Sequence, residues 1–186
     1  MNRWVWSGIA LGALLAAPSA GQAQDAALKE FQVGDAGQMA EKFIGLANAF
    51  DGTDYDWRPM EGVRSVRGVL GLMIAEAYLF PRMWGVSPPE GVETNFNALV
   101  EEASGFEKAR MVAELEEAFE YFQGVLSGMN AEVRSAEGRT FGRSMPNHVG
   151  ITMAMSDMHE HLGQLIAYAR ANEVVPPWSR GGTMGN

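Results

Sequence analysis

An aspartate and a histidine four residues apart are the side chains of this sequence best suited to metal chemistry. Asp157 and His161 lie in the segment SDMHEHLGQL, residues 156–165. On an α-helix, residues four apart share one face, so the carboxylate and the imidazole are presented together. Both groups are protein ligands for zinc, iron, manganese and nickel. The pair therefore predicts a polar cluster on one helix face, with or without a metal ion.

Other polar side chains give weaker indications. His159 is two residues from His161, about 200° around a helix, so it is predicted to face the opposite side, at the surface or against another helix. Arg58 and Arg143 are candidates for binding an anionic ligand, with helix capping or an ordinary ion pair as the alternative. The sequence contains no serine-nucleophile constellation, phosphate-binding loop or nucleotide fingerprint.

Four amphipathic segments must position these side chains, and each is recognised by apolar residues spaced three and four apart. They cover approximately residues 35–50, 66–80, 106–126 and 147–172. Asp35 and Ser65 are the predicted N-caps of the first two, and the Pro-Pro pair at 176–177 excludes extension of the last. Residues 85–93 and 138–146 are predicted to be loops, and no strand alternation is evident. The pattern predicts an all-α protein, a four-helix bundle.

Composition limits the classes of function. The chain has 186 residues, enough for one domain with a real core, and its 47% apolar and 20% charged residues are typical of a globular protein. The formal net charge is −9 and no basic cluster occurs, which argues against nucleic acid as a partner. There is no cysteine, which excludes disulfides, thiolate chemistry and lipoprotein attachment.

The first 23 residues have the pattern of a targeting segment. Arg3 gives a positive start, residues 5–17 are almost wholly apolar, and Gly21 and Ala23 are small residues at the positions read by a signal peptidase. Thirteen residues rise only about 20 Å as a helix, less than the ~30 Å hydrocarbon core of a bilayer. We therefore predict a signal peptide at 1–23, a mature domain at 24–186, a periplasmic or secreted location and no stable membrane insertion, with an uncleaved N-terminal anchor as the alternative.

Several segments, in this order and spacing, resemble the DinB-like (DinB/YfiT) family of helical proteins. They are residues 42–47 (KFIGLA), 55–59 (YDWRP), 62–66 (GVRSV), 159–164 (HEHLGQ), 168–170 (YAR) and 174–177 (VVPP). The resemblance extends over nearly the whole mature chain, residues 42–179. It implies an all-α, DinB-like four-helix bundle, and because bundles of this family often pair through helix faces, it also makes a homodimer a candidate assembly.

The resemblance also implies a three-histidine metal site, from which this sequence departs at two positions. His161 stands at the second histidine of the family's His-x-x-x-His pair, Asp157 stands at the first, and Leu72 replaces the histidine of an earlier helix. Glu76 lies one turn from Leu72, and its side chain can reach back about one turn, roughly 5–6 Å. Glu76, Asp157 and His161 are thus a candidate two-carboxylate, one-histidine site suited to iron or manganese. The alternative is a metal-free cluster in which Asp157 accepts a hydrogen bond from His161 and Glu76 is half-exposed.

The sequence leaves three functions open, and with them whether the protein is an enzyme. The first is an exported, metal-free bundle that binds a small molecule or a partner. The second is a hydrolase- or transferase-like enzyme that uses a divalent iron, manganese, zinc or nickel ion at the rebuilt site. The third is a stress-related dimer without catalysis. Donor atoms of Glu76, Asp157 and His161 within about 4 Å of a common point would favour the second function over the first.

Overall fold

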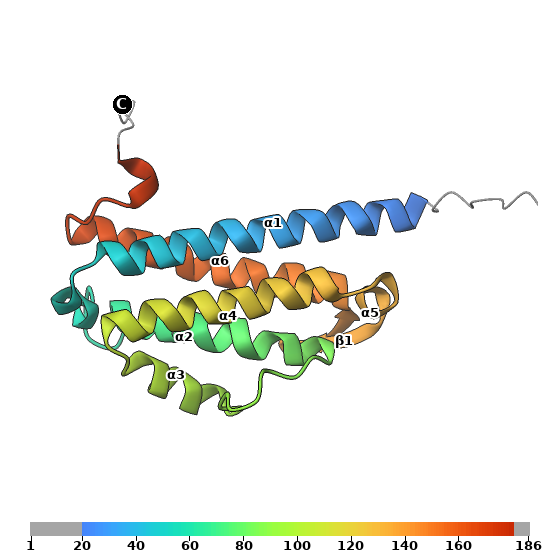
Figure 1. Ribbon diagram of the computed structural model, residues 1–186, viewed down its shortest axis with the longest axis horizontal. Coiled ribbons are helices and arrows are strands. Elements are labelled where there is room, and N and C mark those ends of the chain that lie inside the picture. The colour runs from blue at the N-terminus through green and yellow to red at the C-terminus, as the bar shows by residue number, and fades with distance from the viewer. Residues whose placement is uncertain (1–19, 181–186) are drawn as a thin grey trace, which may run out of the picture.

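Four long helices form the body of the computed structural model, which describes residues 20–180 (Figure 1). These helices are α1 (Ala20–Ala49), α2 (Val66–Leu79), α4 (Lys108–Gly128) and α6 (Asn147–Ala171). α1 and α2 each contact both α4 and α6, so the four close into a bundle around one apolar core. The shorter α3 (Phe96–Ser104) packs against α2. The predicted all-α bundle is confirmed.

α2 is buried along almost its whole length, and it contacts α3, α4 and α6. Every residue from 69 to 79 is buried, and Glu76 is the one charged side chain among them. A helix that is apolar on all sides belongs in a protein interior, so burial of α2 follows from its composition. Its start matches the prediction, since the Ser65 hydroxyl accepts a hydrogen bond from the Gly68 amide at 3.3 Å.

The first helix is much longer than predicted, and Asp35 lies inside it rather than at its start. The added turns are held by contacts with distant segments: Lys29 Nζ donates to the Met129 carbonyl at 2.7 Å, and Gln32 Nε2 donates to Thr152 Oγ1 at 2.9 Å. Such contacts leave no local signal in the sequence. Residues 20–23 of the predicted signal peptide belong to this helix, whereas residues 1–19 lie outside the described part of the chain.

The segment 138–146, predicted to be a loop, contains a β-hairpin instead. β1 (Glu137–Thr140) and β2 (Arg143–Pro146) pair antiparallel, with Gly138 opposite Met145. Phe141 and Gly142 form the turn with φ angles of 48° and 78°, and positive φ at both positions is the signature of a type I′ turn. Strands of four residues are too short for alternation to be recognised in the sequence.

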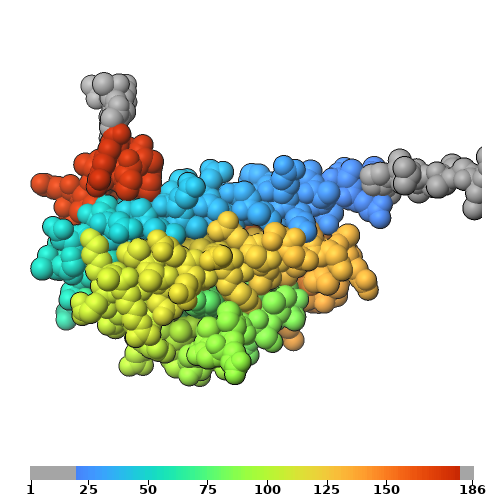
Figure 2. All heavy atoms as spheres, viewed as in Figure 1, coloured from blue at the N-terminus to red at the C-terminus, as the bar shows by residue number. Residues whose placement is uncertain are grey.

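The remaining short elements connect the long helices. They are α5 (Ala131–Ser135) and the 3₁₀ helices η1 (Gly52–Asp56), η2 (Phe80–Trp84) and η3 (Pro177–Ser179). Figure 2 shows α1 and α4 lying side by side, and η3 rests against α1, where Gly45 leaves room for the Pro177 ring. Within residues 20–180, no helix is long and apolar enough to cross a membrane.

Candidate metal centre

Glu76, Asp157 and His161 meet where α2 faces α6. Glu76 Oε1 lies 3.5 Å from His161 Nε2, and Asp157 Oδ2 lies 3.9 Å from the same nitrogen. One donor atom from each residue lies within 4.8 Å of the other two. Three atoms so spaced all lie within about 2.8 Å of a common point. Small side-chain movements would shorten these distances to the 2.0–2.2 Å of metal–ligand bonds.

The cluster is buried on the side of Glu76 and open to solvent on the side of Asp157. The side chain of Glu76 is 2% exposed, that of His161 is 20% exposed and that of Asp157 is 38% exposed. The expectation that a metal-free cluster would leave Glu76 half-exposed is therefore wrong, because α2 is covered on all sides. Because exposure increases from Glu76 to Asp157, water or a ligand can reach the cluster on the Asp157 side.

Burial makes Glu76 an unusual acid. The pKa of Glu76 is raised from 4.5 to about 9, first by desolvation and then by the charge of Asp157, while the Arg64 guanidinium acts in the opposite direction. A hydrogen bond between the Glu76 and Asp157 side chains also raises it. Glu76 therefore keeps its proton at neutral pH in the metal-free protein. Its Oε2 atom is buried without a hydrogen-bond partner among the described residues. A metal ion bound between the two carboxyl groups would take the place of the Glu76 proton.

A chain of hydrogen bonds sets the orientation of the His161 ring. The Tyr168 hydroxyl donates to the Arg64 carbonyl at 3.0 Å and accepts from Gln164 Nε2 at 2.7 Å. This arrangement turns Gln164 Oε1 towards His161 Nδ1, at 3.4 Å. An amide oxygen can only accept, so this contact places a hydrogen on Nδ1, and Nε2 faces the two carboxyl groups. Metal-binding histidines are commonly oriented in this way.

The segment before α2 buttresses this chain and borders a hollow beside the cluster. Trp57 packs edge-on against Tyr168, with ring centroids 5.3 Å apart. Arg58, Arg64 and Gln164 help to line the hollow, which has a volume of about 630 Å³. Neither arginine forms an ion pair within the described residues. Arg143, the other candidate for anion binding, lies exposed on β2, away from this hollow.

Two residues singled out in the sequence lie outside the cluster. His159 Nε2 contacts Asp35 Oδ2 at 2.8 Å and so joins α6 to α1, which confirms the predicted inter-helix packing. Leu72 is buried in the core, where its side chain has no ligand atom to offer.

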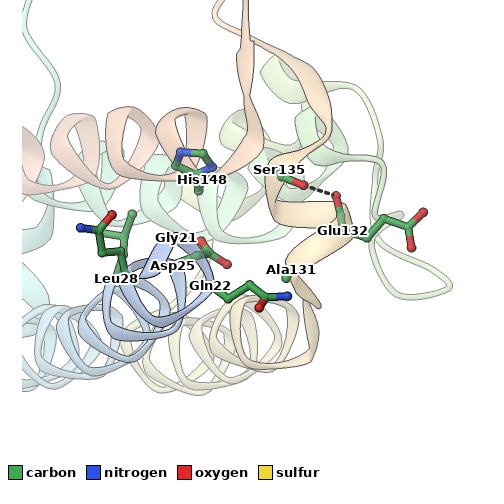
Figure 3. Close-up of a pocket in the computed structure, with 9 residues that line it drawn as sticks. Gly21, Gln22, Asp25, Leu28, Ala131, Glu132, Ser135 and His148 are labelled. Atoms are coloured by element: carbon green, nitrogen blue, oxygen red, sulfur yellow. Dashed lines mark hydrogen bonds between the residues drawn. The ribbon is translucent and has the colours of Figure 1, made fainter. Parts of the chain in front are cut away.

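A second polar region lies at the end of the bundle that carries α5 and the hairpin. In Figure 3, Asp25 of α1, His148 of α6 and Ser135 of α5 border a hollow of about 640 Å³. The adjacent Arg134 is 1% exposed; its Nε donates to both Asp25 oxygens at 2.9 and 3.0 Å, and its Nη1 donates to Gln32 Oε1 at 2.9 Å. The sequence analysis missed this network, because Arg134 is more than 100 residues from both Asp25 and Gln32 and no spacing motif links them.

Comparison with known proteins connects this architecture to solved structures. No protein-family model matches the sequence, and no curated protein matches it. A crystal structure of a DinB-like protein from Bacillus cereus ATCC 10987 superimposes with a TM-score of 0.62 at 14% identity, covering 84% of this chain and 94% of that one. The mycothiol-dependent maleylpyruvate isomerase superimposes with a TM-score of 0.58 at 15% identity, and a mutant form of it with 0.61 at 14%.

The isomerase matches differ from the DinB-like match in coverage. The superposition covers 74% of this chain but only 60% of the isomerase chain, so this chain spans about three fifths of the isomerase's length. At these identities the likeness concerns the fold alone. The protein has the DinB-like fold, as the sequence resemblance implied, and the fold is shared with a mycothiol-dependent isomerase.

Proposed function

We propose that this protein is an exported bundle of the DinB-like fold that binds a divalent metal ion through Glu76, Asp157 and His161, and a small anionic molecule beside it. The observation that carries the proposal is the convergence of three donor atoms within 4.8 Å around a carboxyl group that is 2% exposed. This spacing supports the metal site over the metal-free cluster.

The donor set favours particular metals. Two carboxylate oxygens and one imidazole nitrogen suit ferrous iron or manganese better than zinc or nickel, for which three imidazoles are the better match. When bound, such an ion would supply Lewis acidity to a water or ligand oxygen. The protein's own part is to hold His161 Nε2 towards the site through Gln164 and to exclude water from the Glu76 side.

The adjoining hollow supports an anionic ligand. Arg58 and Arg64 both line it, and unpaired guanidinium groups are well suited to carboxylate or phosphate. Calorimetry of the manganese-loaded protein with inorganic phosphate and with succinate tests this. The Arg58→Gln/Arg64→Gln double variant should lose most of the binding, and Arg143→Gln should keep it. Equal binding by the wild type, the double variant and Arg143→Gln would refute the proposal of an anionic ligand.

A metal-free small-molecule or partner-binding protein is the second candidate. It is favoured by the protonated state of Glu76, since a neutral acid beside the Asp157 carboxylate needs no cation to be tolerated. In that case the cluster orients a ligand by hydrogen bonds, and no metal contributes to function.

Metal binding by matched variants separates the two candidates. The mature protein, purified anaerobically from its own compartment, is analysed for metal content and titrated with Mn²⁺, Fe²⁺, Zn²⁺ and Ni²⁺. We expect one site, tightest for Mn²⁺ or Fe²⁺, abolished by Glu76→Gln and by His161→Ala. Glu160→Gln removes an exposed carboxylate from the same helix and should have no effect. Failure of the wild type to bind any of the four ions would leave the metal-free candidate.

Export is tested by the mass of the mature protein. Cleavage after Ala23 would leave Gln24 as the first residue and would retain Asp25, the partner of Arg134. Intact-mass spectrometry of the periplasmic or secreted fraction should therefore give a chain that begins at or near Gln24. A membrane-bound chain that still carries Met1 would contradict the proposal.

A further inference from the structure

A third hollow, separate from the candidate metal centre, lies between α2, α3, α4 and residues 89–93, with a volume of about 400 Å³. This volume is within the range of small-molecule sites. Its lining combines three aromatic rings, five carboxylates and one guanidinium. The aromatic residues are Tyr78, Phe106 and Tyr121, and the charged residues are Glu90, Glu93, Glu102, Glu114, Glu117 and Arg110. Five negative charges and one positive charge give a formal lining charge of −5 + 1 = −4.

Tyr78 supplies an unused polar group in this hollow. Its side chain is 5% exposed, yet its hydroxyl forms no hydrogen bond with any residue from 20 to 180. The Tyr121 ring lies beside it, with centroids 5.8 Å apart, but the Tyr121 hydroxyl is already committed to the Ser87 carbonyl at 2.7 Å. The residue as a whole is buried, but its hydroxyl oxygen is not among the enclosed polar atoms, so it is accessible from the hollow that Tyr78 lines.

The Tyr78 hydroxyl also lies within the field of two glutamates. Burial raises the pKa of Tyr78 to about 12, and the charges of Glu114 and Glu117 act in the same direction. The hydroxyl therefore stays neutral at physiological pH and can accept a hydrogen bond. Glu117 is exposed and forms no ion pair among the described residues, so its carboxylate is available to a cation.

Arg110 shows how this hollow accommodates a cation. Its guanidinium lies 3.6 Å from the centroid of the Phe106 ring, 3.6 Å from a Glu102 oxygen and 3.7 Å from a Glu114 oxygen. A ring face and carboxylates thus hold one positive group of the protein itself. The same hollow holds a second group of rings and a carboxylate, formed by Tyr78, Tyr121 and Glu117. No cationic side chain of the described residues pairs with this second carboxylate.

We infer that this hollow binds a small organic cation with a primary ammonium or guanidinium group. The cation lies against the Tyr78 and Tyr121 rings, donates one hydrogen bond to the Tyr78 hydroxyl and pairs with Glu117. The rings favour an organic cation over a hydrated metal ion, because a metal ion would need several oxygen ligands at close range.

Calorimetry with simple probes tests the inference. 1,4-Diaminobutane and agmatine carry the required groups, and 1,4-butanediol is an uncharged control of the same length as the diamine. We expect saturable binding of both cations at one site and none of the diol. Tyr78→Phe removes only the hydroxyl and should weaken binding about tenfold, as should Glu117→Gln. Glu101→Gln removes a charge one residue away from the lining and should bind as the wild type does.

Several results would overturn the inference. One is diamine binding no tighter than diol binding. Another is wild-type affinity in both Tyr78→Phe and Glu117→Gln, with circular dichroism showing both folded. Equal weakening by Glu101→Gln and Glu117→Gln would reveal general attraction to an acidic protein. Displacement of the diamine by Ca²⁺ at equal concentration would point to an inorganic ion instead.

Binding of the diamine that persists in Glu76→Gln would support the inference, because it would show that this site is independent of the metal centre.

Discussion

Glu76 and Arg134 are both almost fully buried, but their surroundings differ. Arg134 gives hydrogen bonds to Asp25 and Gln32, and only its Nη2 lacks a partner. Glu76 lies 3.5 Å from His161 Nε2 and beside the Asp157 carboxyl group, and no arginine or lysine of the described residues forms an ion pair with it. A buried charge that stabilises a fold is normally paired. The pairing of Arg134 supports a structural role. We interpret the burial of Glu76 without such a partner as a feature of the proposed metal site that costs stability.

The two regions also differ in what they connect. Arg134 and its partners join α5 to α1, so their loss should loosen one end of the bundle. Glu76, Asp157 and His161 lie where α2 faces α6, with an open side towards solvent. The comparison predicts that substitutions at Arg134 lower stability, and that substitutions at Glu76 raise stability while removing metal binding.

Arg134→Ala should have the largest effect. It leaves Gln32 and Asp25 without their partner, and breaking a buried pair costs about 3–5 kcal/mol of unfolding free energy. Urea denaturation measures the change. Arg143→Ala removes an exposed arginine from the nearby hairpin and should alter stability by less than about 0.5 kcal/mol. Equal effects of the two substitutions would contradict the structural role of Arg134.

Glu76→Gln should stabilise the metal-free protein at neutral pH. The pKa of Glu76 is about 9 in the folded protein, against an ordinary value of 4.5, so the unfolded chain loses this proton at a lower pH than the folded protein does. The free energy of unfolding of the wild type is therefore highest below pH 4.5 and falls as pH rises towards 9. At pH 7 the cost of keeping this acid protonated is about 3 kcal/mol, which the uncharged glutamine avoids.

Chelator-treated proteins measured from pH 5 to 9 provide the check. The gain from Glu76→Gln should grow with pH over this range. Glu160→Gln, a control on α6, should leave the pH profile of the wild type unchanged. A constant difference between Glu76→Gln and the wild type across the range would show that Glu76 titrates normally.

Tyr168→Phe should have the smallest effect on stability and a larger one on the metal. Loss of the hydroxyl removes its bonds to Gln164 and the Arg64 carbonyl, costing about 1 kcal/mol of unfolding free energy. Because Gln164 would no longer be held, Mn²⁺ affinity should fall about tenfold, as is typical when an outer partner of a metal ligand is lost. Thermal melts and calorimetry measure the two effects. Unchanged Mn²⁺ affinity would mean that the chain through Gln164 does not orient His161.

Periodicity predicted the parts of the fold that are locally encoded. α2, α4 and α6 follow their apolar spacing, and the Ser65 cap is where its residue type places it. The early turns of α1 could not be predicted in this way, because Gln32 and its partners meet only in the folded bundle. The short hairpin escaped because four residues per strand give no measurable alternation.

The site was predictable to a similar extent. Asp157 and His161 are one helical turn apart in the sequence, so their shared face follows from helix geometry. Glu76 came from the family resemblance, and its burial depends on packing around α2 that no local pattern reveals. The unused hydroxyl of Tyr78 depends on three elements coming together, and the sequence alone gave no sign of it.

The number of protons released on metal binding tests the central claim most directly. Titration with Mn²⁺ at pH 8, in two buffers of different ionisation enthalpy, measures this number above the range in which imidazoles ordinarily titrate. If the buried acid Glu76 becomes a ligand, about one proton should be released per ion bound, because its pKa of about 9 leaves it protonated beforehand. Binding without proton release, or the same release from Glu76→Gln, would contradict the account.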